Sequence, residues 1–334
     1  MIAPRKFGHS LINPVALGCM NLDHAYGPAA SFEDGESLLL RALDLGVDMF
    51  DTATLYGFGK NETRLGQVLA KHRSKFTLAS KGGMGAVMFP DGPKRVIDGS
   101  AATVKAHCEA SLKRLNTDVI DLYYLHRWDK KVPIEESVGA LADLLREGKV
   151  RAIGLSEVSA NTLKKAHAIH PIAAVQTEYS LWTRNPEIAV IKACEEIGAA
   201  FVAFSPVARQ FLSATPPNVE MLDAKDIRRG MPRFKPENYA ANLALRAPYL
   251  QIAVEAGCTP AQLAIAWVLT RGPHVIAIPG TKNIEHLEDN MGASQVTLSD
   301  AVVQKLDALI NQHTVKGGRY DAQAESEVDT ETFA

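Results

Sequence analysis

The sequence has few cysteines, and their spacing excludes two common kinds of site. Cys19, Cys108, Cys194 and Cys258 lie far apart and form no CxxC pair. Neither a zinc site nor a disulfide framework is therefore predicted, and no metal ion is expected. This cysteine usage favours a reducing compartment.

Excess charge and long apolar runs are also lacking. A formal net charge of −2 over 334 residues provides no large basic surface, so nucleic acid is not an expected partner. No run approaches the roughly 18 to 20 apolar residues of a membrane span. The start, MIAPRKFGHS, lacks the apolar segment of a secretory signal. We expect a cytoplasmic protein that acts on a small molecule; the sequence predicts no oligomeric state.

Eight short apolar runs, rich in Val, Ile, Phe and Tyr, alternate with longer segments of helical period. Apolar residues recur three or four apart in segments such as SFEDGESLLLRALDLG from 31 and SVGALADLLREGK from 137. This alternation predicts an α/β fold with a parallel sheet, most simply a closed (β/α)₈ TIM barrel. The predicted strands are VALGCMN from 15, VDMFDTA from 47, FTLASKG from 76, DLYYLHR from 121, VRAIGLSEV from 150, AAVQTEY from 173, AAFVAFSPV from 199 and VIAIPGT from 275.

Three segments depart from the repeat. Residues 5–14 resemble a β-hairpin with a turn near Gly8 and His9, placed to plug the barrel floor. A long insertion, about residues 208–260, precedes the eighth strand, and such segments are usually functional. The tail, residues 317–334, is predicted to be a mobile strap. We expect a single domain over residues 1–334.

Nucleotide-binding loops of the usual kinds are missing. GFGKNE and GMGAVM begin like a dinucleotide-binding loop but lack its last glycine, and no GxxxxGK[ST] occurs. These absences favour the barrel over an open doubly wound sheet.

Four polar residues fall at the carboxyl ends of consecutive predicted strands, where barrel enzymes carry their active sites. They are Asp51, Tyr56, Lys81 and His126. Each alone has an ordinary explanation: a turn aspartate, a packed tyrosine, a solvated lysine or a core histidine. Four such coincidences on one rim are improbable, so we interpret them as one site.

This set suits proton donation to a carbonyl oxygen. A tyrosine is a weak acid, with a pKa near 10. A lysine ammonium about 4 Å away would favour the phenolate by about 4 kcal/mol at an effective dielectric of about 20, roughly three pKa units before other effects offset it. Asp51 would hold Lys81, and His126 would bind the substrate oxygen or shuttle protons. Because the set supplies no reductant, a hydride-donating cofactor is implied.

With these residues the sequence resembles the aldo-keto reductase family over nearly its whole length. The resemblance rests on DTATLYGFGKNETRLG, SKGG, YYLHRW, IGLSEVS, VQTEYSLW, AFSPVARQFL, CTPAQLAIAWVL, IPGTKNIEHLEDN and GGRY. It implies reversible reduction of an aldehyde or ketone by NADP(H) bound across the barrel mouth. Asp51, Tyr56, Lys81 and His126 match the family's catalytic tetrad.

The resemblance also implies a set of cofactor contacts. Ser156 and Gln176 match residues that bind the nicotinamide amide. Phe204 matches the aromatic residue whose ring stacks on the nicotinamide. The next loop surrounds the pyrophosphate, and a later loop and helix start take the 2′-phosphate, where a helix N-terminus and a lysine suit a dianion. The remaining implied contacts are Ser205, Pro206, Val207, Arg209, Gln210, Gly280, Thr281, Lys282, His286, Asp289 and Asn290.

Four positions depart from the usual family pattern. Glu157 stands where many members have Asn, and Gln210 replaces a common Gly. Asn283 occupies a position where Arg often binds the 2′-phosphate. His286 occupies a second position that is also Arg in some members. Losing a charge-assisted contact costs about 1.5 to 3 kcal/mol, which is about one to two decades of NADP preference. We favour NADP(H), with NAD(H) as the alternative.

Several rim residues are candidates for the substrate pocket, which their types predict to be apolar to aromatic. Two further functions stay open: a cofactor-binding regulatory subunit with slow turnover, as in channel-associated barrels of this family, and a Schiff-base aldolase using Lys81. The substrate candidates are His24, Tyr26, Met88, Arg127 and Trp128, with Phe89 and Trp182 as further aromatic candidates.

Overall fold

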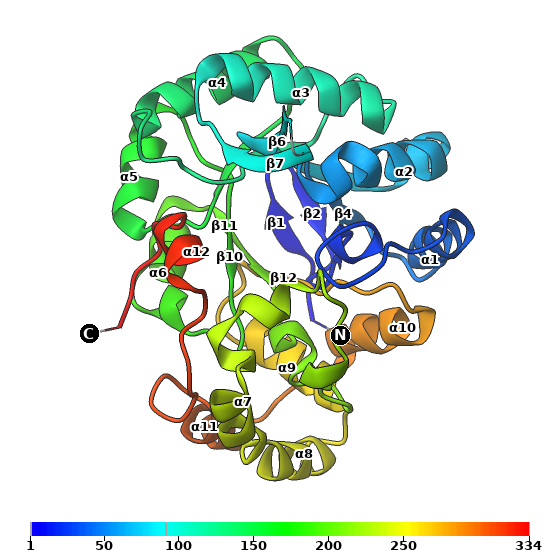
Figure 1. Cartoon of the computed structure of the whole chain (residues 1–334), viewed down its shortest axis with the longest axis vertical. Helices are drawn as coiled ribbons and strands as arrows, with labels where there is room; N and C mark the ends of the chain where they lie inside the picture. The colour runs from blue at the N-terminus through cyan, green and yellow to red at the C-terminus, as the bar shows by residue number, and fades with distance from the viewer. Residues whose placement is uncertain (1, 91, 334) are drawn as a thin grey trace.

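The computed structural model describes residues 2–90 and 92–333. Its centre is a sheet of eight parallel strands in the order β12-β11-β10-β9-β8-β5-β4-β3, ringed by helices (Figure 1). This confirms the predicted barrel, and each predicted strand contains an observed one. The strands are β3 (Leu17–Gly18), β4 (Met49–Asp51), β5 (Thr77–Gly82), β8 (Leu122–Leu125), β9 (Ile153–Ser156), β10 (Ala174–Glu178), β11 (Ala200–Phe204) and β12 (Val275–Ile278).

The sheet closes on itself between its first and last strands. Parallel bridges join Val15 to Ala277 and Gly18 to Gly280. The Ala16 N–H donates to the Ala277 carbonyl at 2.9 Å. The carboxyl ends of all eight strands therefore meet at one mouth, which is what positions the site.

The helices form where apolar periodicity and capping residues coincide. Ser31, Ser100 and Ser159 each accept a hydrogen bond from the third residue of the following helix, and Thr259 forms a complete capping box. The α-helices are α1 (Phe32–Asp44), α2 (Lys60–Leu69), α3 (Ala101–Leu115), α4 (Ile134–Arg146), α5 (Ala160–Ile169), α6 (Val190–Ile197), α7 (Pro236–Leu243), α8 (Arg246–Glu255), α9 (Pro260–Leu269), α10 (Ile284–Gly292), α11 (Asp300–Leu309) and α12 (Ala322–Ser326).

Short 3₁₀ turns occupy many of the connections. They are η1 (Met20–Leu22), η2 (Tyr56–Gly59), η3 (Ala70–Lys75), η4 (Asn185–Glu187), η5 (Ala208–Gln210), η6 (Val219–Met221), η7 (Ile227–Gly230), η8 (Pro232–Phe234) and η9 (Ala293–Gln295).

The predicted N-terminal hairpin is present. Strands β1 (Arg5–Phe7) and β2 (Ser10–Ile12) pair antiparallel. Phe7 and Ile12 are 1% exposed and pack with Met49 and Leu122 inside the barrel. The hairpin thus closes the barrel end opposite the mouth.

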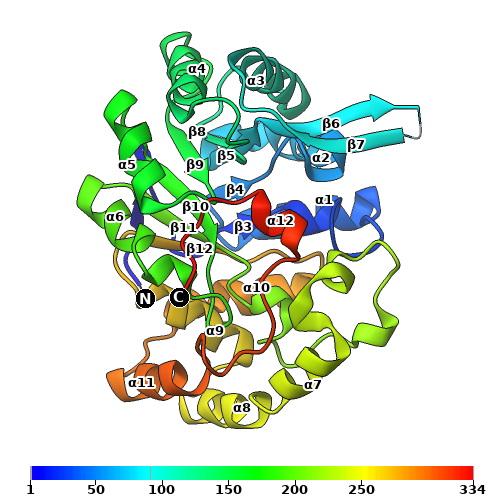
Figure 2. The same cartoon turned by 60° about the vertical axis from the view of Figure 1, so that its left-hand side comes forward.

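A second hairpin was not predicted. Strands β6 (Met84–Phe89) and β7 (Gly92–Ile97) pair antiparallel after β5 and extend away from the barrel (Figure 2). The sequence predicts a position on the rim of the substrate pocket for Met88 and Phe89 of this segment, without a strand. Met88 is 74% exposed on this hairpin.

The C-terminal segment, residues 317–333, packs on the barrel, which differs from the expected mobile strap. Asp329 forms a bridge with Val158, which follows β9. Lys130 donates hydrogen bonds to the carbonyls of Ser326 and Val328. Figure 2 shows α12 lying above the strand ends. The physical reason is that the β-bridge and these hydrogen bonds offset the entropy of ordering a polar segment.

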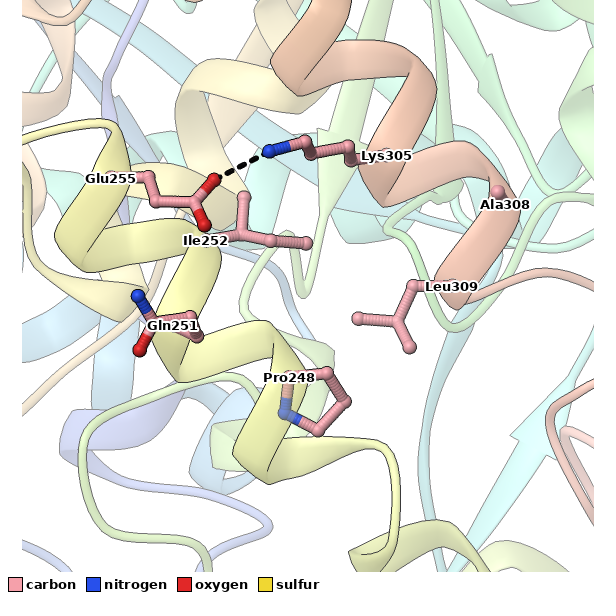
Figure 3. Close-up of a pocket in the computed structure, with 7 residues that line it drawn as sticks. All are labelled: Pro248, Gln251, Ile252, Glu255, Lys305, Ala308 and Leu309. Atoms are coloured by element: carbon pink, nitrogen blue, oxygen red, sulfur yellow. Dashed lines mark hydrogen bonds and ion pairs between the residues drawn. The ribbon is translucent and has the colours of Figure 1, made fainter.

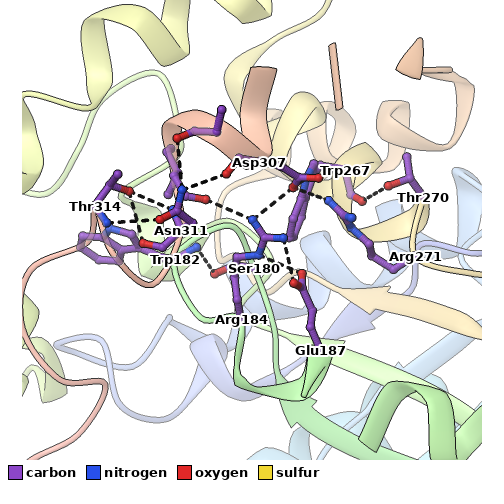
Figure 4. Close-up of polar contacts among 12 residues, drawn as sticks. Ser180, Trp182, Arg184, Glu187, Trp267, Thr270, Arg271, Asp307, Asn311 and Thr314 are labelled. Atoms are coloured by element: carbon purple, nitrogen blue, oxygen red, sulfur yellow. Dashed lines mark hydrogen bonds and ion pairs between the residues drawn. The ribbon is translucent and has the colours of Figure 1, made fainter. Parts of the chain in front are cut away.

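Asp307 on α11 ties three parts of the outer layer together. Its carboxylate accepts hydrogen bonds from the Trp267 indole at 2.9 Å and the Arg271 guanidinium at 2.6 Å. Arg184 lies between Asp307 and Glu187 and pairs with both (Figure 4). The segment after β10 and helices α9 and α11 are thereby fixed to one another.

Within the described ranges, no single helix is long and apolar enough to cross a membrane. The segments Pro236–Glu255 and Pro260–Leu269 are long and apolar enough for a span only when taken together, and they are bent by 80° relative to each other.

Candidate functional site

The four rim residues meet at the mouth of the barrel. Asp51 ends β4, Lys81 lies in β5, His126 follows β8 and Tyr56 begins η2. Lys81 forms an ion pair with Asp51 and donates hydrogen bonds to the Tyr56 hydroxyl at 3.2 Å and to the Thr52 carbonyl at 2.9 Å. An ammonium has three N–H donors. All three of Lys81 are therefore occupied, which fixes its position.

Burial makes these interactions strong. Lys81 is fully buried, and Asp51, His126 and Tyr56 are 2%, 5% and 7% exposed. The His126 ring stands edge-on to the Tyr56 ring, with centroids 5.8 Å apart. Charges interact more strongly where water is excluded.

The protonation states follow from burial and charge. Burial opposes the charged form of Lys81, but Asp51 and Tyr56 outweigh it and raise its pKa, so the ammonium is retained. Burial also raises the pKa of Tyr56; Lys81 opposes this and Asp51 adds to it. The expected lowering of the Tyr56 pKa toward neutrality is thus wrong for this structure, because desolvation of the phenolate outweighs the attraction of Lys81. Burial, with nearby Arg127 and Lys81, holds the pKa of His126 well below its usual range.

Gln176 joins this cluster in a way the sequence did not indicate. Its side-chain amide donates to the second oxygen of Asp51 at 2.8 Å. Both carboxylate oxygens of Asp51 are therefore engaged, one by Lys81 and one by Gln176.

A cavity of about 780 Å³ opens above the tetrad, within the size range of small-molecule sites. Asp51, Tyr56 and His126 line it, whereas Lys81 lies beneath them. Every predicted cofactor residue also lines it: Ser156, Gln176, Phe204, Ser205, Pro206, Val207, Arg209, Gln210, Gly280, Thr281, Lys282, His286, Asp289 and Asn290.

The loop after β11 has an unusual backbone. Ser205, Ala208, Arg209 and Gln210 have φ of 52°, 49°, 53° and 80°, which are left-handed values that residues other than glycine seldom adopt. Such conformations persist only where surrounding contacts impose them, typically at binding sites.

The side chain of Arg209 is tied to residues outside its own loop. Its guanidinium is buried, forms an ion pair with Glu178 and donates to the Tyr26 hydroxyl at 3.0 Å. Its side chain therefore holds the loop from within, while the loop lines the cavity. A different arginine, Arg228 of η7, contacts Gln210 at 2.8 Å and brings the insertion to the cavity wall.

The far end of the cavity lies at the N-terminus of α10. Asn283 caps this helix by accepting from the His286 N–H at 2.9 Å. Lys282 donates to the Pro28 carbonyl at 3.0 Å and is exposed. Asp289 accepts from the Thr259 hydroxyl at 2.9 Å. Asn283 thus has a helix-capping role in the position where Arg is usual.

The predicted substrate residues divide into two groups. His24, Tyr26 and Arg127 line the cavity. Met88 lies out on the β6–β7 hairpin, and Trp128 is half-buried with its indole donating to the Val132 carbonyl at 2.7 Å. Neither of these two lines the cavity. The outer part of β6 carries Met88 away from the mouth.

The two further aromatic candidates also lie elsewhere. Phe89 is on the outer part of the hairpin and 42% exposed. Trp182 is buried against Phe211, with ring centroids 4.0 Å apart.

Sequence reasoning missed several lining residues. Arg95 of β7 pairs with Glu327 of the C-terminal segment at 2.6 Å, and both border the cavity. Met84 and Tyr320 also line it. Tyr320 lies in GGRY and Met84 in GMGAVM, two segments quoted from the sequence, whereas Arg95 and Glu327 had no local signal, since long-range folding brings them to the mouth.

Another hollow lies on the outside of the molecule between α8 and α11 (Figure 3). Ile252, Pro248 and Leu309 line it beside the Lys305–Glu255 ion pair. It is shallow and lacks the convergent polar groups of a reaction site. Among the described residues, no group of three or more His, Cys, Asp or Glu could hold a metal ion.

Comparisons with known proteins agree with this geometry. A family model described as the aldo/keto reductase family matches residues 14–311. A protein of Glycine max named "Probable aldo-keto reductase 1" is 42% identical over 322 residues, covering 96% of this chain and 92% of its own length. An aldo-keto reductase of Schizosaccharomyces pombe, whose name includes NADP(+), is 38% identical over 336 residues, covering 99% of this chain and 98% of its own length.

Solved structures share the fold and the length. The glycerol dehydrogenase of Gluconobacter oxydans is similar at a TM-score of 0.86 with 28% identity, covering 95% of this chain and 97% of that one. An aldo/keto reductase of Klebsiella pneumoniae, solved with NADP and acetate, is similar at a TM-score of 0.73 with 27% identity, covering 96% of this chain and 99% of that one. With the family model spanning most of the sequence and relatives matching nearly end to end, the chain belongs to the aldo/keto reductase family.

Proposed function

We propose that the protein reduces an aldehyde or ketone to the alcohol, reversibly, with NADPH as the reductant and Tyr56 as the proton donor. The observation that carries this proposal is the contact between the Tyr56 hydroxyl and the buried Lys81 ammonium at the base of the cavity. A phenol held against a fixed cation can release its proton to a carbonyl oxygen without a large change in solvation.

The residues around the cavity suit NADP(H). Ser156 and Gln176 offer polar groups at one end, beside the half-buried ring of Phe204. Lys282 and the N-terminus of α10 offer positive charge at the other. When bound there, NADPH would supply the hydride that reduces the carbonyl carbon. The naming of NADP in two relatives supports this choice over NAD.

The tetrad residues have distinct roles in this proposal. Tyr56 donates its proton to the carbonyl oxygen, and Lys81 stabilises the phenolate that remains. Asp51 keeps Lys81 charged and in place. His126 is neutral and lines the cavity, so a ring N–H can donate to the substrate oxygen without adding charge. In the reverse direction Tyr56 takes a proton from the alcohol.

The Schiff-base alternative does not suit Lys81. An amine must be neutral to attack a carbonyl, whereas Asp51 and Tyr56 raise the pKa of Lys81. Its three donors are occupied, and it is fully buried beneath the cavity wall. Borohydride treatment with an aldehyde should therefore leave the mass of the protein unchanged.

The test is NADPH consumption, followed by absorbance, with a panel of aromatic and aliphatic aldehydes and ketones. Tyr56→Phe should lower kcat by about 10²- to 10⁴-fold, since it removes the acid, while NADPH still binds with unchanged Kd. No turnover across the panel would overturn the proposal. Binding of NADPH without appreciable turnover would favour the regulatory alternative. Full activity of Tyr56→Phe would refute Tyr56 as the acid.

A further inference from the structure

Two carboxylates and two arginines form a buried charge cluster at the barrel mouth, next to the tetrad but separate from it. Glu157 follows β9 and Glu178 ends β10, and they are 1% and 3% exposed. Arg319 of the C-terminal segment donates to Glu157 at 2.6 Å and to Glu178 at 3.2 Å. Arg209 pairs with Glu178 from the other side. The cluster contains equal numbers of opposite charges.

Glu178 depends on its arginine partners for its charge. Burial alone would raise the pKa of Glu178, but Arg209, Arg319 and Arg233 lower it to about 2. The Tyr320 hydroxyl lies within hydrogen-bonding distance of Arg209, at 3.3 Å, and of Arg319, at 3.1 Å. Removing one partner of a buried ion pair leaves an uncompensated charge, which is strongly unfavourable.

Arg319 contacts three adjacent strand ends at once. Besides Glu157 and Glu178, its guanidinium lies 5.9 Å from the centre of the Phe204 ring, at the end of β11. Glu178 is paired in register with Phe204. One side chain from the end of the chain therefore fastens the ends of β9, β10 and β11 together.

These three strand ends carry the proposed nicotinamide contacts. Ser156 immediately precedes Glu157, Gln176 lies two residues before Glu178, and Phe204 is itself in contact with Arg319. Glu157 has a left-handed φ of 58°. Its carboxylate accepts from both Arg319 and the Glu178 N–H, at 2.8 Å. The ion pair with Arg319 thus helps to impose the backbone turn that orients Ser156.

We propose that Arg319 is a positioning residue for the cofactor: it holds Ser156, Gln176 and Phe204 in their binding arrangement and thereby sets the affinity for NADPH. The inference rests on the proposed function, since it concerns the same cavity. Arg319 acts through Glu157, Glu178 and Phe204 rather than by taking part in the reaction.

A second contact of the same segment provides the matched control. Lys130 donates to the Ser326 carbonyl at 3.0 Å and to the Val328 carbonyl at 2.6 Å, and it does not line the cavity. Lys130→Met loosens the segment without disturbing the charge cluster. Arg319→Met disturbs both. Arg319→Lys keeps the charge but cannot span two carboxylates with a planar fork.

The experiment measures the NADPH Kd by fluorescence titration, the kcat at saturating NADPH and the thermal midpoint for the unaltered protein and the three variants. Arg319→Met should raise the Kd about tenfold or more while kcat stays within about threefold of the unaltered value. Arg319→Lys should give an intermediate Kd. Lys130→Met should lower the thermal midpoint and leave the Kd within about threefold.

Equal Kd values for Arg319→Met and the unaltered protein would overturn the inference. So would an equally weakened Kd in Lys130→Met, since the effect would then come from loosening the segment. If Arg319→Met does not fold, an Arg319→Lys variant with unaltered Kd overturns the inference and one with a raised Kd supports it. Failure of the unaltered protein to bind NADPH would overturn the proposed function and this inference together.

Discussion

Lys81 illustrates how much of the site is set by single side chains. Its ammonium contacts Asp51, Thr52 and Tyr56 and has no donor left over. The sequence predicted the contacts with Asp51 and Tyr56, because all three residues fall at adjacent strand ends. It did not predict that Gln176 binds the other oxygen of Asp51, since that contact joins residues 125 apart.

The pKa of Tyr56 shows the limit of reasoning from charge alone. The sequence predicts that Lys81 attracts the phenolate of Tyr56, but it does not show how deeply Tyr56 is buried. Burial has the larger effect on the pKa of Tyr56. The depth of a side chain depends on the whole assembled mouth and cannot be deduced from the residue's neighbours in sequence.

A pH profile tests this at the residue scale. Reduction needs protonated Tyr56, so activity is present below its pKa and is lost as pH rises through it. Because burial raises that pKa above the ordinary value of about 10, and His126 is already neutral, kcat/KM for reduction should be flat from about pH 6.5 to about pH 9. Initial rates in buffers of constant ionic strength would show this. An ionisation of the free enzyme between those limits would contradict it.

At the scale of elements, the eight strands and the floor hairpin were predictable because each is a local pattern. The β6–β7 hairpin was not, since MGAVMF has no alternation and its partner strand begins with Gly92 and Pro93. The contacts of the C-terminal segment were not predicted, for a different reason. Its polar composition suggested mobility, but the carboxylates that hold Arg319 lie 141 and 162 residues away.

Helix α10 gives a prediction about cofactor choice. Its N-terminus lies at the cavity beside Lys282, and its cap is Asn283 rather than a cation. Lys282→Met should therefore weaken NADPH binding about ten- to a hundredfold, by loss of a charge-assisted contact. NADH lacks the 2′-phosphate, so its Kd should stay within about threefold.

Titration of both cofactors against the variant would measure this difference. Lys305→Met, on the outer groove of Figure 3, serves as the control and should alter neither Kd. Equal weakening of NADPH and NADH binding by Lys282→Met would place the 2′-phosphate elsewhere.

At the scale of the whole molecule, the barrel buries charged side chains as well as apolar ones. Phe7 and Ile12 pack at the closed end of the barrel, while the ion pairs of Lys81 and Arg319 are buried near its mouth. Buried charges of this kind tie folding stability to pH, because the unfolded chain does not hold them in pairs.

Glu178 makes that link measurable. Its pKa falls from 4.5 to about 2 on folding, so the stability it contributes is present above its unfolded pKa and is lost as pH falls from about 4.5 through about 2. The shift corresponds to about 3 kcal/mol. Glu178→Gln should be less stable at neutral pH, since two arginines lose a partner, and should lose less stability on acidification.

Denaturant unfolding at pH 7 and at about pH 3.5 would compare this variant with the exposed Glu220→Gln, which should follow the unaltered protein. If Glu178→Gln lost as much stability on acidification as the unaltered protein, Glu178 would not be the source of the pH dependence.

The most direct test of the account follows the atom that the reaction transfers. NADPH carrying deuterium at both hydrogen positions of nicotinamide C4 is incubated with an aromatic aldehyde and either the unaltered protein or Tyr56→Phe, and the alcohol is analysed by mass spectrometry. The account predicts deuterium at the carbinol carbon with the unaltered protein and about 10²- to 10⁴-fold slower formation of that alcohol with Tyr56→Phe. Formation of alcohol without deuterium, or at equal rates with both proteins, would contradict it.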